Sequence, residues 1–110
     1  MEKNARIKME YICMEVAQER IKQHDKWGEQ NHNLTTWIAI LAEEQGEASR
    51  EAVDYCCDNP PPKEERLESP KTIQYNRLMR YRNELIQTAA VAVQMIESLD
   101  RNELANLKPS

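Results

Sequence analysis

Glycine and phenylalanine are scarce in this sequence, which has two glycines (Gly28 and Gly46) and no phenylalanine among 110 residues. Residues that favour helices, namely alanine, glutamate, leucine, glutamine and arginine, are plentiful instead. The composition therefore predicts an all-α protein. Its length suits one domain, spanning residues 1–110.

Other features are missing as well. No segment approaches the ~20 consecutive apolar residues that a membrane span needs, and the first residues lead into an amphipathic segment that does not look like a signal peptide. The three cysteines, Cys13, Cys56 and Cys57, are odd in number and contain no C-x-x-C pair. We therefore expect no disulfide framework and a cytoplasmic location.

The charge balance excludes one class of partner. The net charge is -4, whereas proteins that bind nucleic-acid polymers usually carry a basic surface. With 40% hydrophobic and 31% charged residues, the chain should fold as a soluble globular protein.

Hydrophobic periodicity and capping residues predict three helices, over residues 3–26, about 34–57, and 71 or 72 to 99 or 100. Gly28 can cap the first helix, and Asn33, Thr35 or Thr36 can cap the second. Between the last two helices lies a proline-rich, charged segment, 58–70, that is either a mobile loop or carries one short turn near 63–67. The tail, 101–110, has room for one turn at 103–107.

Apolar stripes indicate which helix faces should be buried. On the first helix, Arg20 and Gln23 continue the apolar stripe with polar side chains. Either these side chains line a pocket, or the stripe reaches the solvent at this point. The stripe of the last helix consists of Leu78, Tyr81, Leu85, Ala89, Ala92, Ile96 and Leu99.

The second helix contains the carboxylate cluster Glu43-Glu44-Gln45-Gly46-Glu47. Glu44 and Glu47 project to the same side, where like charges repel, and Gly46 costs about 1 kcal/mol relative to alanine. Glu44 also borders the apolar sector of Trp37, where an uncompensated charge is costly. A bound divalent cation would explain these choices, and a solvated acidic face is the other interpretation.

The last helix repeats the pattern with Glu84 and Gln87, again three residues apart beside an apolar stripe. Oxygen pairs on two helices can converge on one Mg²⁺ ion, which favours hard oxygen ligands and often bridges to substrate phosphates. Nearby basic residues, including Arg80, could neutralise phosphate charge.

These motifs resemble those of the MazG-like, all-α nucleotide pyrophosphohydrolases, specifically a phage and bacterial branch. The likeness rests on E-E-x-x-E at residues 43–47, on Glu84-x-x-Gln87 and the helix that follows, and on the segment 37–42; it spans about residues 15–99. It implies a helical bundle completed by homodimerisation or higher homo-oligomerisation. It also implies hydrolysis of a nucleoside triphosphate to the monophosphate and pyrophosphate with Mg²⁺ or Mn²⁺.

The resemblance also implies roles for particular residues. Glu44, Glu47, Glu84 and Gln87 would bind metal, and Glu43 and Glu44 would be catalytic, with Glu43 acting as a ligand or orienting the attacking water. Candidate substrate-binding residues are Arg20, Gln23, Trp27, Arg80 and Tyr81, and His32 is a weaker candidate.

One position departs from the family pattern, because Gln87 stands where the broader family has aspartate. The substitution removes a negative charge, for which Asp54 is a candidate replacement. A noncatalytic helical module that binds a nucleotide or a protein therefore remains the alternative function.

Overall fold

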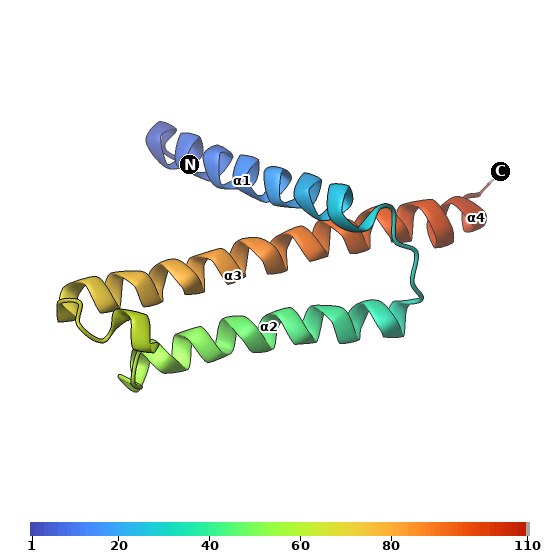
Figure 1. Ribbon diagram of the computed structural model, residues 1–110. Helices are drawn as coiled ribbons and strands as arrows, with labels where there is room; N and C mark the ends of the chain where they lie inside the picture. Colours follow the sequence, from blue (N-terminus) through green and yellow to red (C-terminus); the bar gives the residue numbers. More distant parts are fainter. Residues whose placement is uncertain (110) are drawn as a thin grey trace.

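The computed structural model describes residues 1–109, and its backbone is helical over most of that length (Figure 1). Three long helices, α1 (Lys3–Trp27), α2 (Leu34–Cys56) and α3 (Pro70–Leu99), are joined by two connections. Shorter elements are the 3₁₀ turn η1 (Lys63–Glu65), the π turn η2 (Asp100–Leu104) and α4 (Ala105–Leu107). No strand occurs in residues 1–109, which confirms the predicted all-α class.

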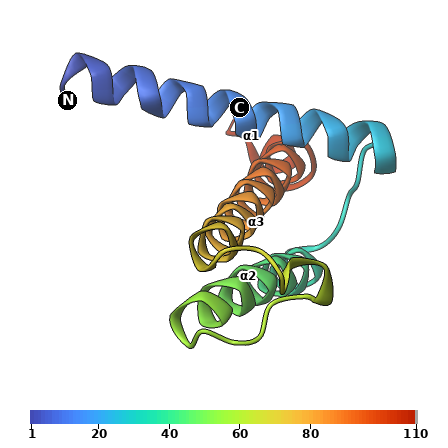
Figure 2. The ribbon, with the colours of Figure 1, turned by 60° about the vertical axis from the view of Figure 1, so that its left-hand side comes forward.

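Helix α3 is the centre of the structure. Helix α2 runs antiparallel to it on one side, and α1 crosses it on the other side, so the three helices form three layers (Figures 1 and 2). No helix in residues 1–109 is long and apolar enough to cross a membrane.

Local capping sets the helix boundaries close to the predicted ones. Gly28 ends α1 with a φ of 72°, a conformation that glycine adopts without strain. The side chain of Asn33 accepts a hydrogen bond of 2.8 Å from the Thr36 amide and so caps α2. Helix α3 begins earlier than predicted, at Pro70, because Ser69 caps it and proline suits the first helical position.

The C-terminal tail continues α3. The π turn of η2 carries the helix from Asp100 onward into α4, so the turn expected at 103–107 is part of one nearly continuous helix. The Asn102 amide donates to the Ser98 hydroxyl at 3.2 Å across this π turn.

The proline-rich segment is fastened to α3 by a buried arginine. Arg77 is 2% exposed, and its guanidinium donates to Asp58 Oδ1 at 2.8 Å and to the Asn59 carbonyl. Asp58 has a φ of 50°, which lets the chain turn away from the end of α2. Of the two alternatives for this segment, the structure has the short turn, η1, in a loop held by hydrogen bonds.

The buried core is small and lies where α2 meets α3. Trp37 is 2% exposed, and its indole N–H donates to the Ser98 hydroxyl at 3.1 Å. Ala48, Ala90 and Val91 complete the buried apolar set. Helix α3 thus turns a partly polar side, which includes Arg77 and Ser98, toward its neighbours.

Much of the predicted apolar stripe of α3 is on the surface of the single chain, so the other helices do not cover the whole of this face. Leu78, Leu85 and Ile96 are 44%, 45% and 58% exposed. Helix α1 likewise has no fully buried residue. Amphipathic periodicity identifies an apolar face correctly but does not identify what covers it.

We predict that Arg77→Ala lowers the free energy of unfolding by about 2 kcal/mol and makes the 58–69 segment sensitive to proteases, because charged hydrogen bonds to the loop are lost. Urea denaturation and limited proteolysis measure both effects. Arg6→Ala is the matched control, since its ion pair with Glu10 is exposed and should contribute less than about 0.5 kcal/mol. Equal stability losses in the two variants would contradict this role.

A candidate metal site between α2 and α3

Three carboxylates converge where α2 faces α3. Glu44 and Glu47 come from successive turns of α2, and Glu84 comes from the middle of α3. One oxygen from each carboxylate lies within 4.8 Å of the others. The predicted convergence of the acidic positions of the two helices is therefore present in the structure.

Two of these carboxylates carry buried oxygens without partners. Glu44 Oε2 and Glu84 Oε2 are inaccessible and accept no hydrogen bond. Buried polar atoms are normally paired, so each of these is costly in the absence of a ligand or an ordered water. The donor set consists of carboxylate oxygens, which fits a hard cation such as Mg²⁺ or Mn²⁺.

The electrostatics of the cluster agree with its geometry. Burial, and then repulsion from Glu47, Glu43 and Glu19, raises the pKa of Glu44. Burial and the proximity of Glu47 and Glu44 also raise the pKa of Glu84. Desolvation and like charges both favour the protonated acids, and a bound cation would reverse this preference.

The antiparallel register of α2 and α3 brings the carboxylates together. One turn beyond Glu47, the Glu51 carboxylate meets the Arg80 guanidinium, with an Nε–Oε2 distance of 3.3 Å. Arg80 precedes Glu84 by one turn, so the two helices are in the same register at both levels. Side chains one turn apart on α2 thereby face side chains one turn apart on α3.

The other residues that the sequence placed at or near the metal site are not all part of the carboxylate cluster. Gln87 is half-buried one turn after Glu84, whereas Glu43 is exposed and does not belong to the converging set. A Cβ added at Gly46 would meet no atom within 4 Å, so close packing does not explain that glycine. Asp54 does not compensate for Gln87, because its carboxylate accepts a hydrogen bond of 2.8 Å from Asn59 at the end of α2.

Both arginines predicted to bind substrate are paired with carboxylates in this structure. Arg20 Nε lies 2.5 Å from Glu97 Oε1, about 20 Å along α3 from Glu84 at 1.5 Å per residue. Arg80 Nη1 lies 2.8 Å from Glu65 Oε2, in addition to its pairing with Glu51. A phosphate would have to compete with these carboxylates.

The remaining candidates are scattered. Gln23 has a buried Oε1 without a partner, and Tyr81 is half-buried outside the set of converging carboxylates. Trp27 is 62% exposed at the end of α1, and the loop after it accepts a hydrogen bond from Arg101 in η2, beyond the end of α3 that is distant from Glu84. His32 packs edge-on against Trp37, at 4.8 Å between ring centroids, and so has a structural contact.

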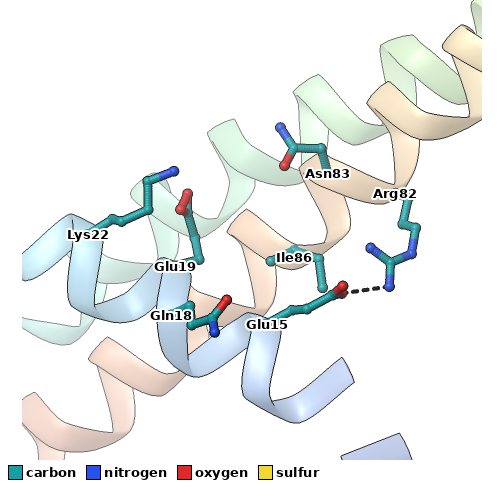
Figure 3. Close-up of a pocket in the computed structure, with 7 residues that line it drawn as sticks. All are labelled: Glu15, Gln18, Glu19, Lys22, Arg82, Asn83 and Ile86. Carbon is teal, nitrogen blue, oxygen red and sulfur yellow. Dashed lines mark hydrogen bonds and ion pairs between the residues drawn. The ribbon is translucent and has the colours of Figure 1, made fainter. Parts of the chain in front are cut away.

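A polar cleft that the sequence did not reveal lies between α1 and α3 (Figure 3). Its volume is about 230 Å³. The residues that line it are Glu15, Gln18, Glu19, Lys22, Arg82, Asn83 and Ile86. In Figure 3, Glu15 is ion-paired with Arg82, at 2.6 Å, while Glu19 and Lys22 project from α1 near Asn83 of α3.

This cleft adjoins the carboxylate cluster. Asn83 directly precedes Glu84, and the charge of Glu19 contributes to the raised pKa of Glu44. The spacing of Glu15, Gln18, Glu19 and Lys22 shows a polar face on α1. Only the crossing of α1 over α3 reveals that this face borders the cluster.

Comparisons with known proteins found no matching family model, no matching curated protein and no matching solved structure.

We predict that Glu84→Gln stabilises the metal-free protein at pH 7. A carboxyl group whose pKa is raised on folding favours the folded state below its ordinary value of 4.5, and this contribution is lost as the pH rises through the raised pKa. The glutamine has no charge to repel, so the difference from the wild type should shrink as the pH falls below about 4.5. Saturating Mg²⁺ should raise the melting temperature of the wild type but not that of Glu84→Gln.

Thermal melts over a pH series, with Mg²⁺ and with chelator, measure both parts of this prediction. Glu68→Gln removes an exposed carboxylate elsewhere and serves as the matched control. An Mg²⁺ stabilisation of equal size in all three proteins would contradict a site at Glu84.

Proposed function

We propose that this chain is a Mg²⁺-dependent nucleotide pyrophosphohydrolase, cytoplasmic, that converts a nucleoside triphosphate or related nucleotide to the monophosphate and pyrophosphate. The observation that supports it is the convergence of Glu44, Glu47 and Glu84, with two buried oxygens that lack partners. The motif resemblance supports the same reaction. The exposed, free cysteines Cys13, Cys56 and Cys57 suit a reducing compartment.

In this proposal, the carboxylates hold the cation and the neighbouring cleft receives the nucleotide. Glu44, Glu47 and Glu84 provide oxygens from two helices, and Gln87 can add its amide oxygen or bond a metal-held water. Mg²⁺, when bound, would neutralise phosphate charge and lower the pKa of a water molecule. Mn²⁺ has similar ligand preferences and should substitute.

The cleft supplies groups suited to a nucleotide. Lys22 carries positive charge, and Arg82 would offer its own after releasing Glu15, while Gln18 and Asn83 can both donate and accept hydrogen bonds. Gln23 lies one turn beyond Glu19 on α1, and its buried Oε1 has no hydrogen-bond partner. These residues therefore extend the expected substrate-binding set, in which Arg80 would act only after exchanging a carboxylate for a phosphate.

The reaction itself requires positioning and charge neutralisation. The oxygen of a water molecule forms a bond to the α-phosphorus, and the bond from that phosphorus to the bridging oxygen of the β-phosphate breaks. In this proposal Glu43, exposed beside Glu44, orients this water and accepts its proton. The leaving pyrophosphate takes the electron pair of the broken bond.

A noncatalytic nucleotide-binding module is the second candidate, and Gln87 is the observation that favours it. A glutamine in place of aspartate leaves the site with one charge fewer, which weakens the attraction for a divalent cation. Such a module would bind metal and nucleotide together without releasing pyrophosphate.

We predict that the purified chain releases pyrophosphate from at least one nucleotide in a panel of ribonucleoside and deoxyribonucleoside triphosphates assayed with Mg²⁺ or Mn²⁺. Glu47→Gln should lower kcat/KM by about 100-fold or more, because it removes a charged metal ligand. Glu68→Gln should retain wild-type activity. Nucleotide-dependent stabilisation without any turnover would instead favour the noncatalytic module.

We also predict that Gln87→Asp strengthens Mg²⁺ binding by about 10-fold, since a fourth carboxylate adds charge to the same side of α3. Isothermal titration calorimetry of the metal alone measures this change without reference to activity. In the metal-free protein the same substitution should lower the melting temperature through added repulsion. Unchanged Mg²⁺ affinity would place residue 87 outside the metal site.

A further inference from the structure

The short turn η1 places a carboxylate between two hydrogen-bond donors of α3. Asn76 Nδ2 donates to Glu65 Oε1 at 2.9 Å, and Arg80 Nη1 donates to Glu65 Oε2 at 2.8 Å. Asn76 and Arg80 are four residues apart on α3, so they lie on the same side of the helix. Both oxygens of Glu65 are thereby held, and its side chain is 17% exposed.

This pair of donors suits a negatively charged oxygen group. A guanidinium presents its N–H groups in a planar fork that matches both carboxylate and phosphate. The side-chain amide of Asn76 adds a neutral donor one turn away. The hydrogen bonds from Asn76 and Arg80 lower the pKa of Glu65, because they favour the charged form of the group that accepts them.

The two carboxylates paired with Arg80 come from segments that are held very differently. Glu51 lies within α2, the helix most extensively packed on α3. Glu65 lies in a three-residue turn of the connection 57–69, which contains no fully buried residue and whose Leu67 is completely exposed. Segments with little buried apolar surface open most readily. Glu65 can therefore leave with the loop, whereas Glu51 stays on a packed helix.

Open space borders the Glu65 carboxylate. A hollow of about 470 Å³ is lined by Glu65, Asn76, Met79, Arg80 and Asn83. Asn83 also lines the polar cleft between α1 and α3 (Figure 3). Because the hollow and the cleft share this wall residue, a phosphate group held by the two donors would lie next to the cleft.

We propose that Asn76 and Arg80 form a binding site for a phosphate group, which Glu65 occupies as an internal substitute until a phosphate-bearing ligand displaces it. The η1 turn is then an autoinhibitory segment, because its carboxylate fills the site in the free chain. Displacement frees the loop, while Arg80 keeps its pairing with Glu51 and stays in position. That the phosphate belongs to the substrate rests on the proposed function, whereas the binding of a phosphate group does not.

An NMR titration of the full chain with inorganic pyrophosphate, in the presence of a metal chelator, tests this site. The side-chain amide of Asn76 is the reporter, and sodium chloride at matched ionic strength controls for screening of the ion pair. Pyrophosphate, but not chloride, should shift the Asn76 resonance and accelerate trypsin cleavage after the exposed Arg66 of the loop. Glu65→Gln removes the competing charge, so the dissociation constant for pyrophosphate should fall by about 10-fold.

Glu64→Gln is the matched control, since Glu64 is exposed in the same turn, and its pyrophosphate affinity should stay within about twofold of the wild type. Arg80→Gln should release the loop but abolish the pyrophosphate-dependent shift of Asn76. Equal affinities in the wild type, Glu64→Gln and Glu65→Gln would overturn the proposal, and so would a shift that chloride reproduces. A nucleotide panel without turnover would refute the proposed enzyme and leave these titrations unchanged.

Discussion

The antiparallel packing of α2 against α3 is the interaction on which the other features of this structure depend. It buries Trp37 against Ser98 at one end and pairs Glu51 with Arg80 toward the other. Between these contacts it forces Glu44 and Glu47 to face Glu84. The sides of α3 that do not face α2 have two different surroundings. One side packs against α1, and another carries the apolar stripe.

The cost of this arrangement is electrostatic. Three carboxylates are held together, and two of them have lost water from one oxygen without gaining a partner. Basic residues do not relieve the repulsion, because Arg80 is shared between Glu51 and Glu65, and Arg20 is paired with Glu97. A cation from outside the chain is the simplest source of compensation, and the proposed chemistry uses the charge it would bring.

Local rules predicted the helices and the identity of the acidic cluster, because capping, periodicity and i, i+3 spacing act within one segment. Tertiary contacts determined what those rules could not. Arg77 carries no local signal that separates it from the other arginines of the last helix, yet it is buried and orders the proline-rich loop. Arg80 looked like a phosphate ligand, yet it bridges two carboxylates. The apolar stripe of α3 was identified correctly as a face, but Leu78, Leu85 and Ile96 remain exposed in the single chain. The polar cleft could not be predicted, because it is formed by the way α1 crosses α3 and no sequence pattern within one helix determines that crossing.

The register between α2 and α3 has a consequence for how this chain can vary. Four residues forward on α2, from Glu47 to Glu51, correspond to four residues backward on α3, from Glu84 to Arg80. Contacts between side chains of α2 and α3 therefore hold the register of the two helices, and the loop that joins them does not set it. Insertions within residues 58–69 would lengthen the turn and leave the carboxylates opposite one another. A single residue inserted between Pro70 and Glu84 would instead rotate one half of the cluster by about 100° away from the other.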